Sequence, residues 1–182
     1  MTISSIHQLE KTIGDMLLKQ TELKRSRIVN GLSIRGADLS KFITDNVSLS
    51  YDVSDVALIF EISAMNEDSI NITETEDDSI REDACFEVSL TCYGNESLLK
   101  MKQLKARLES DKARYDLSEE GVCFIDASSI IQINDFLNET IYPRTSMTFR
   151  IACELQVSLV DDFNEIEAKP DIAIETAFKD CC

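Results

Sequence analysis

The chain has 182 residues, and its 34 acidic residues outnumber its 18 basic residues, which gives a net charge of −16. This charge argues against a generic nucleic-acid coat or attraction to an anionic membrane, because both need clustered Lys and Arg. Hydrophobic residues make up 43% of the chain, enough to bury a real core in one domain.

The first predicted element is an amphipathic helix from about Ser4 to Gln20, capped by Ser4 or Ser5. Its periodic, polar sequence differs from the apolar stretch of a signal peptide, and no apolar run in the chain reaches the roughly 18 residues of a membrane span. We therefore predict a protein that is cytosolic at synthesis and has no membrane partner. The next thirty residues, around Gly31 and Gly36, are predicted to be an irregular arm or loop.

Two strands are predicted next, over residues 56–63 and 84–92, and apolar and polar residues alternate strictly in the second. Residues 65–83 between them hold eight acidic residues and one base, which predicts a solvated loop or a long hairpin connection. Cys92 and, in a later strand, Cys153 fall on the apolar phase, so we predict that both are small buried side chains.

The best-defined helix is predicted to begin at Asn95, as its N-cap, and to reach Arg114. Six of the 18 basic residues fall within residues 94–115. The absence of interleaved aromatic residues favours a solvated helix face over a nucleic-acid site. A second use of this face would be to meet an acidic face of another copy.

The C-terminal part is predicted to be mostly strand. The segments are a turn at 118–121, a strand at 122–126 that 128–133 continue past a bulge, a connection at 134–143, a long strand at 149–159 and an edge strand at 171–176. This order predicts an α+β fold: a mainly antiparallel sheet of about four strands with two helices packed on one face, plus the N-terminal helix and long loops.

Residues that usually carry chemistry are sparse. His7 is the only histidine, the six cysteines contain no Cys-x-x-Cys pair, and the five glycines are scattered. A Cys/His metal site, a histidine-based catalytic group and a phosphate-binding loop therefore lack support. We predict that the protein is not an enzyme and takes no metal or cofactor.

Charge is distributed unevenly along the chain. Residues 1–50 carry a net +2, residues 51–93 carry −11, residues 94–115 carry +3 and residues 116–182 carry −10. Two acidic blocks thus flank the basic helix, and we expect this polarity to direct association between copies.

Three features stand in a fixed order. The strand Ala84–Tyr93 runs through Gly94-Asn95-Glu96-Ser97-Leu98-Leu99 into the Lys/Arg-rich helix; Gly121-Val-Cys-Phe124 follows the helix; and Arg144 precedes Met147-Thr-Phe-Arg150, which opens the long strand. Over about residues 51–176 this order resembles the tail-terminator or neck-protein family of tailed bacteriophages.

The resemblance implies a structural virion protein that assembles in the host bacterial cytoplasm. It would form a ring, typically of six subunits, that caps the tail tube, stops its polymerisation and joins it to the head connector or head-completion protein. Residues 1–50 would then be an N-terminal helix and arm, residues 51–176 the ring-forming α+β domain, and residues 177–182 a flexible tail. The extended region 33–51 and the acidic insertion 65–83 depart from the family pattern.

Two hypotheses about the ring follow. The basic helix, through Lys100, Lys102, Lys105 and Arg107, would meet an acidic block of the next subunit, and Arg144 and Arg150 match the family's basic positions in a subunit contact. Acidic residues at the lumen would repel DNA and let it pass without specific binding. The candidates are Glu74, Glu76, Asp77 and Asp78.

The charge also suits a different class of protein. An acidic inhibitor that mimics DNA would bind the basic groove of a host protein. It would be a monomer or dimer with one dominant negative face.

Overall fold

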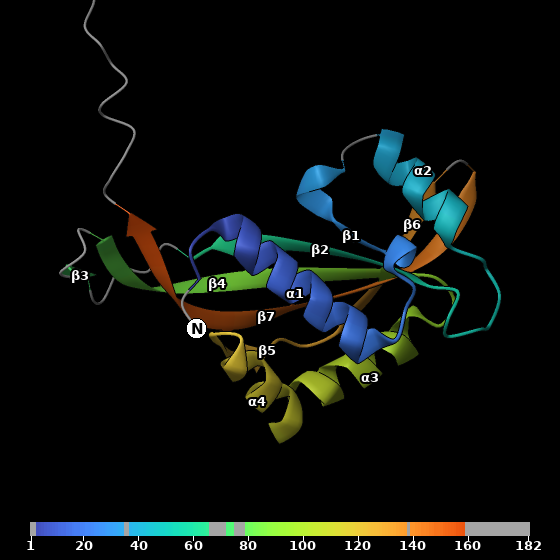
Figure 1. Ribbon diagram of the computed structural model, residues 1–182. Helices are drawn as coiled ribbons and strands as arrows, with labels where there is room; N and C mark the ends of the chain where they lie inside the picture. The colour runs from blue at the N-terminus through green and yellow to red at the C-terminus, as the bar shows by residue number, and fades with distance from the viewer. Residues whose placement is uncertain (1–2, 35–36, 66–71, 75–78, 138, 159–182) are drawn as a thin grey trace, which may run out of the picture.

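The computed structural model describes residues 3–34, 37–65, 72–74, 79–137 and 139–158. Its helices and strands, in chain order, are α1 (Ile6–Thr21), the 3-10 turn η1 (Arg25–Arg27), β1 (Ile28–Asn30), the 3-10 turn η2 (Gly31–Ser33), α2 (Ala37–Asn46), β2 (Ala57–Ala64), β3 (Ile72–Glu74), β4 (Ser79–Tyr93), α3 (Ser97–Leu108), α4 (Asp111–Glu119), β5 (Val122–Ala127), β6 (Ile131–Leu137) and β7 (Thr140–Ser158) (Figure 1).

The described strands form one sheet of seven strands. The order is β1-β2-β4-β7-β5, with β3 paired to β4 and β6 paired to β7. Only the β1–β2 pair is parallel among these pairs, so the predicted mainly antiparallel α+β fold is confirmed. The detail was wrong: the sheet has seven strands in place of about four.

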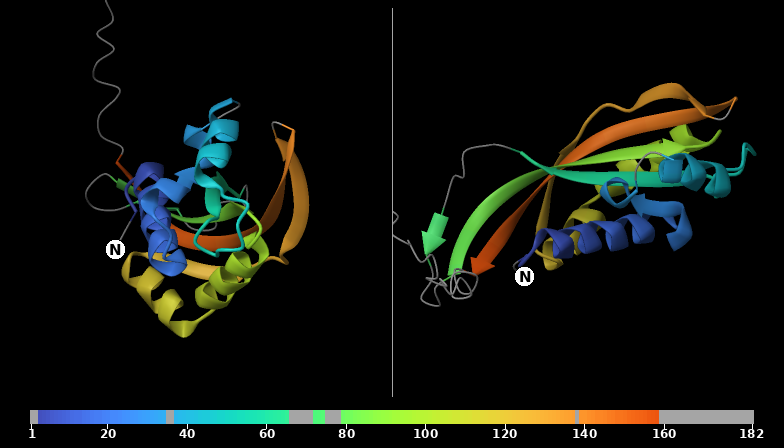
Figure 2. Two further views of the ribbon diagram at one scale, coloured as in Figure 1. Left: turned by 90° about the vertical axis from the view of Figure 1, so that its right-hand side faces the viewer. Right: turned by 90° about the horizontal axis from the view of Figure 1, so that it is seen from above.

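The 19-residue strand β7 organises the sheet. One of its edges pairs with β4 from Arg144 to Ser158. The other edge pairs first with β6, over 140–146, and then with β5, over 149–153. At roughly 3.3 Å per residue, a strand of this length spans more than a small core needs. Its first part therefore extends past the core as one arm of a hairpin, which Figure 2 shows in orange.

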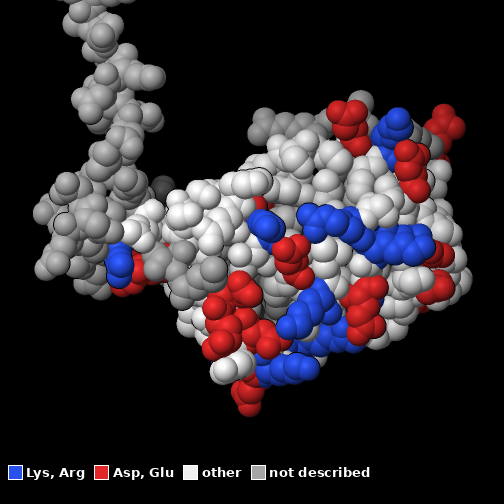
Figure 3. Space-filling view, in the orientation of Figure 1, with Lys and Arg blue, Asp and Glu red and all other residues white. Residues whose placement is uncertain are grey.

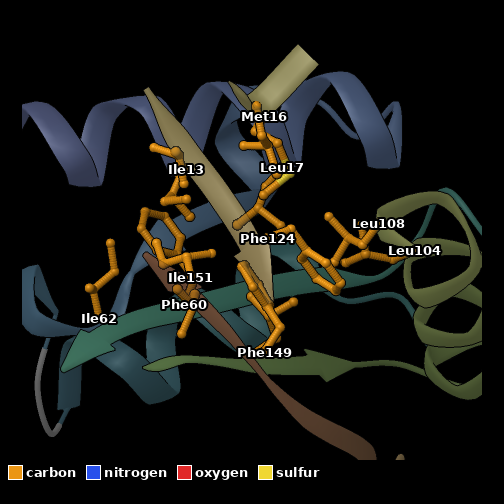
Figure 4. Packing of buried hydrophobic residues seen from close by; sticks show 14 of the residues in the cluster. Ile13, Met16, Leu17, Phe60, Ile62, Leu104, Leu108, Phe124, Phe149 and Ile151 are labelled. Carbon is orange, nitrogen blue, oxygen red and sulfur yellow. The ribbon is translucent and has the colours of Figure 1, made fainter. Parts of the chain in front are cut away.

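The larger core lies between one face of the sheet and the helices α1, α3 and α4. Figure 4 shows Ile13 and Leu17 of α1 and Leu104 of α3 directed toward the sheet. Phe149 is fully buried there, and its ring stacks on that of Phe124 with centroids 6.1 Å apart. Cys92 and Cys153 are buried in the same cluster, as predicted from their alternation.

A smaller core covers part of the opposite sheet face. Ile43 and Val47, at the end of α2 and just beyond it, pack there with Ile59, Tyr93 and Tyr142 of the sheet. Helices therefore lie on both faces, whereas the sequence predicted two on one face. The helix α2 was not predicted from the sequence because Gly31 and Gly36 come just before it and indicated an irregular arm.

The N-terminal helix was predicted well. Ser5 accepts a hydrogen bond from the backbone of Gln8, which caps α1 at the expected place. The arm that follows contains η1, β1, η2 and α2, so its prediction as irregular was wrong. The strand β1 is only three residues long, too short for alternation to reveal it.

The predicted basic helix is two helices. It breaks after Leu108, and Ser110 caps α4 by accepting a hydrogen bond from the backbone of Ala113. Asn95 does not cap α3: its side chain donates to the Leu49 carbonyl, and the first helical residue is Ser97. A buried hydrogen bond of 2.9 Å between the hydroxyls of Ser97 and Thr145 ties the start of α3 to β7.

Two predictions about strands are corrected. Residues 134–137 and 140–143, predicted as a connection, are paired ends of β6 and β7, and the bulge lies inside β5, between Phe124 and Asp126. In the acidic segment 65–83, predicted as a solvated loop or a long hairpin connection, the described residues include β3 and the start of β4, which pair with each other. The predicted strand at 171–176 lies outside the described residues, and the division at residue 50 stays a prediction. Among the helices described, none is long and apolar enough to cross a membrane.

Candidate assembly surfaces

Two of the predicted interface residues on α3 bind inside their own chain. Lys105 Nζ donates to the carbonyl of Ser128 over 2.7 Å, and Arg107 donates to the carbonyl of Gln20 at the end of α1. Arg107 Nη2 also lies 3.0 Å from Glu22 Oε1. These side chains therefore fix α3 to its neighbours, a role that sequence spacing could not reveal.

The other two lysines of α3 differ in their surroundings. Lys100 is half-buried, and this burial lowers the pKa of its ammonium group. Lys102 is exposed and has no hydrogen bond or ion pair in the described part of the chain. Of the four lysine and arginine candidates on α3, Lys102 is thus the freest to meet another molecule.

Arg144 holds the hairpin formed by β6 and the first part of β7, residues 131–146. Its Nη1 donates to Asp135 Oδ2 over 3.0 Å, and Tyr93 Oη donates to the same oxygen over 2.8 Å. Burial, followed by the hydrogen bond to Asp135, raises the pKa of Tyr93 to about 12. The Gly94 amide also donates to the Pro143 carbonyl over 3.0 Å. The hairpin is therefore fixed to the sheet.

Arg150 forms a two-pronged contact with the carboxylate of Asp126. Its Nε donates to Oδ1 over 2.8 Å and its Nη2 donates to Oδ2. The hydrogen bond from Arg150 lowers the pKa of Asp126. The pair lies on the sheet face opposite the larger core, where β5 meets β7 after the bulge. Arg150 thus links β7 to β5 just after the bulge.

Of the four predicted lumen residues, only Glu74 lies in the part of the chain that the structure describes. Glu74 ends β3, and its backbone pairs with Ile80 of β4. Glu76, Asp77 and Asp78 lie outside the described residues. Their role at a lumen stays a prediction.

The hairpin of residues 131–146 carries an exposed apolar surface that sequence analysis missed. Phe136 is 71% exposed and faces Ile141, which is 58% exposed, across the two strands. Ile131 and Ile133, on the other face, are 61% and 44% exposed. Because these residues alternate between the two faces, neither face showed a clear apolar pattern. Isolated exposed apolar residues are ordinary, but Phe136 and Ile141 form an adjacent exposed pair on one face, which makes the hairpin a candidate interaction surface.

A groove lies at the opposite edge of the sheet, between α1 and β1. Its volume is about 520 Å³, within the range of roughly 300–1,000 Å³ of common binding sites. The ring of Phe60 and the side chains of Leu18 and Ile28 line it, and Gly14 leaves it open on the side of α1. The charged side chains that line it are Glu10, Lys11 and Arg25.

Charge on the helical face is mixed. Figure 3 shows blue and red side chains interleaved over α1, α3 and α4. Lys19 and Asp116, which join α1 to α4 with an Nζ–Oδ2 distance of 2.6 Å, are one such pair. The two acidic blocks of the sequence therefore do not make this face uniformly negative.

The described residues contain no group of three His, Cys, Asp or Glu side chains that could hold a metal ion. Among the described residues, the exposed apolar hairpin and the groove between α1 and β1 lie on opposite edges of the sheet. Exposed apolar residues and grooves are kinds of surface through which proteins contact partners. In a comparison with known families, residues 8–176 match the family described as phage neck terminator protein.

The match covers most of the chain, so the protein belongs to the phage neck terminator family, and the predicted resemblance is confirmed. It is a structural component of the neck of a bacteriophage virion. A search of curated proteins gave no significant match.

Proposed function

We propose that the protein forms a ring of six subunits at the head-proximal end of the tail tube. The ring stops polymerisation of the tube protein and offers its other side to the head connector or head-completion protein. The observation that carries this proposal is the family match over residues 8–176, whose description names a terminator of the neck. Assembly would take place in the cytoplasm of the host bacterium.

The arrangement of surfaces supports a ring. A closed ring needs two different surfaces on each subunit, one matched to the other on the neighbour. The exposed hairpin and the groove between α1 and β1 differ in shape and lie at opposite edges of the sheet. The solvent-exposed Lys102 of α3 adds a charged position that is available to a subunit or to another neck protein.

The test is the mass of the purified protein by light scattering on a sizing column, followed by negative-stain images of the same peak. We expect several times the 20.5 kDa of one chain and particles with a central hole. Adding the protein to polymerising tube subunits of the same phage should shorten the tubes. A monomer at all concentrations, without effect on tube length, would contradict the proposal.

The acidic blocks suit a neck ring because DNA has to pass through its lumen without being bound. Acidic side chains at the lumen repel phosphate, so DNA is not held during passage. Replacing Glu74, Glu76, Asp77 and Asp78 together by Ser should leave ring formation unchanged and slow DNA ejection from assembled phage. Unchanged ejection kinetics would remove these residues from the lumen.

The alternative of an acidic inhibitor rests on charge alone. It needs a dominant negative face, and the helical face in Figure 3 carries both signs. Family membership supports the neck role instead. Salt-sensitive binding to a basic host protein by a stable monomer would revive the alternative.

A further inference from the structure

We propose that the hairpin of residues 131–146 inserts its tip into the groove between α1 and β1 of the next copy of this chain, and that this head-to-tail contact closes the ring. The inference rests on the proposed function, since it identifies the contact between subunits of that ring. The occupant of the groove is thus a second copy.

The tip of the hairpin has the chemistry of an interface anchor. Phe136 and Ile141 face each other across the strands and expose 71% and 58% of their surface. Aromatic side chains, Phe included, are enriched at the cores of protein interfaces, and the residues that contribute most to binding lie in well-packed pockets. Burying such a pair removes apolar area from water at about 25 cal/mol per Å².

The hairpin is also held in place before any contact forms. Asp135 accepts hydrogen bonds from Tyr93 and Arg144, and the Pro143 carbonyl accepts one from Gly94. An element already fixed in its binding conformation loses less conformational entropy on association. Arg144, which the sequence predicts at a subunit contact, therefore also helps to position an apolar side chain.

The groove matches the tip in polarity and in charge. Its floor includes the largely buried Phe60 ring with Leu18 and Ile28, and Gly14 of α1 lies beside that ring. Of the charged residues that line it, Arg25 is paired with Asp15 over 3.1 Å, whereas Lys11 is exposed. On the hairpin Asp135 is paired with Arg144, so Glu139 is the exposed acid next to the tip that would meet Lys11. Opposite charges of this kind set the orientation of the partner.

The positions of the two surfaces favour a second copy over the tube protein or the connector. In the two views of Figure 2 the orange hairpin and the dark-blue α1 lie on opposite sides of the molecule. A hairpin cannot reach the groove of its own subunit from there. Each copy can instead fill the groove of the next, which is the heterologous contact that a ring requires.

The test uses two variants that damage one surface each. Phe136→Lys removes the anchor and places a positive charge opposite Lys11. Gly14→Gln fills the groove, and the position tolerates a side chain because an added Cβ would lie 3.6 Å from the Phe60 ring, an ordinary contact. Ile141→Lys is a second hairpin variant, and Tyr115→Lys, at a tyrosine 63% exposed on α4, is the matched control.

We expect each hairpin or groove variant alone to lose the ring and to elute as a single 20.5 kDa chain that still unfolds cooperatively on heating. Mixing Phe136→Lys with Gly14→Gln should give a complex of twice that mass and no larger species. Each mixed pair retains one intact hairpin and one intact groove, which is enough for one contact. The Tyr115→Lys control should keep the ring.

Several outcomes would overturn the contact without touching the proposed function. One is a wild-type ring that persists in both hairpin variants. Another is a ring that Gly14→Gln does not affect while the hairpin variants lose it, since that would indicate hairpin pairing with hairpin. A third is a mixture that stays monomeric. A wild-type protein that never forms rings would contradict the proposed function itself.

Discussion

Arg144 Nη1 and Asp135 Oδ2 lie 3.0 Å apart and join the two strands of the hairpin at the edge of the sheet. The sequence predicted Arg144 as a subunit contact. Within the chain its guanidinium fixes the element that exposes Phe136 and Ile141, and a contact of Arg144 with a neighbour stays a prediction. Arg144 would thus act on assembly through the hairpin, and the following predictions separate such positioning roles from direct contacts.

The tyrosine of this cluster makes stability sensitive to alkali. The pKa of Tyr93 is about 12 in the folded chain, against about 10 for a free tyrosine. A raised pKa stabilises the fold below pH 10, and this stabilisation is lost as the pH rises toward 12. We therefore expect Tyr93→Phe to weaken the fall in the free energy of unfolding between pH 10 and 12, measured by urea denaturation.

Tyr115→Phe, at an exposed tyrosine, is the matched control for the loss of one hydroxyl and should behave as the wild type. Burial also raises the pKa of Cys92 to about 12, so both proteins keep a further alkaline loss of stability. If Tyr93→Phe lost stability with pH as the wild type does, the ionisation of Tyr93 would make no contribution to the alkaline loss of stability.

Two phenylalanines should differ sharply in their effect on stability. Phe149→Ala removes a fully buried ring and its stacking on Phe124, so the free energy of unfolding should fall by about 3–5 kcal/mol. Phe136→Ala, at a 71% exposed side chain, should change it by less than about 0.5 kcal/mol. Urea denaturation of both variants checks this. A large loss in Phe136→Ala would mean that the hairpin tip supports the fold itself.

Two glycines should respond to alanine in opposite directions. Gly94 has a φ of +126° and an added Cβ would lie 3.1 Å from Val56 Cγ1, so Gly94→Ala should destabilise the chain by about 1–3 kcal/mol. Gly14 lies within α1, where an added Cβ would make an ordinary contact of 3.6 Å with the Phe60 ring, so Gly14→Ala should stabilise the chain by about 0.5–1 kcal/mol. Thermal unfolding of the two variants measures both changes in stability. Equal changes would contradict the explanation from the backbone conformation at each glycine.

The basic side chains of α3 can be separated by the same approach. Arg107→Glu breaks the contacts with Gln20 and Glu22, so it should lower stability by about 1 kcal/mol. Lys102→Glu, on the exposed side of the same helix, should leave stability unchanged. A loss of rings in Lys102→Glu at full stability would identify Lys102 as an assembly contact. Rings that persist in this variant would exclude that role.

The sequence by itself determined the elements whose pattern is local. Alternation from Ala84 to Cys92 predicted the core of β4, and helical spacing after Ser5 predicted α1. Short or two-sided elements gave no such pattern. The strand β1 has three residues, and β6 exposes apolar side chains on both faces.

Tertiary structure alone decided what the charged and apolar surface residues do. Arg107 and Arg144 looked like free surface charges because their partners, Gln20, Glu22 and Asp135, lie elsewhere in the sequence. Charge counts describe residue types, whereas the pairing of charges depends on which strands and helices become neighbours. The same packing exposes Phe136 and leaves the groove beside Gly14 open, so the assembly surface follows from the fold.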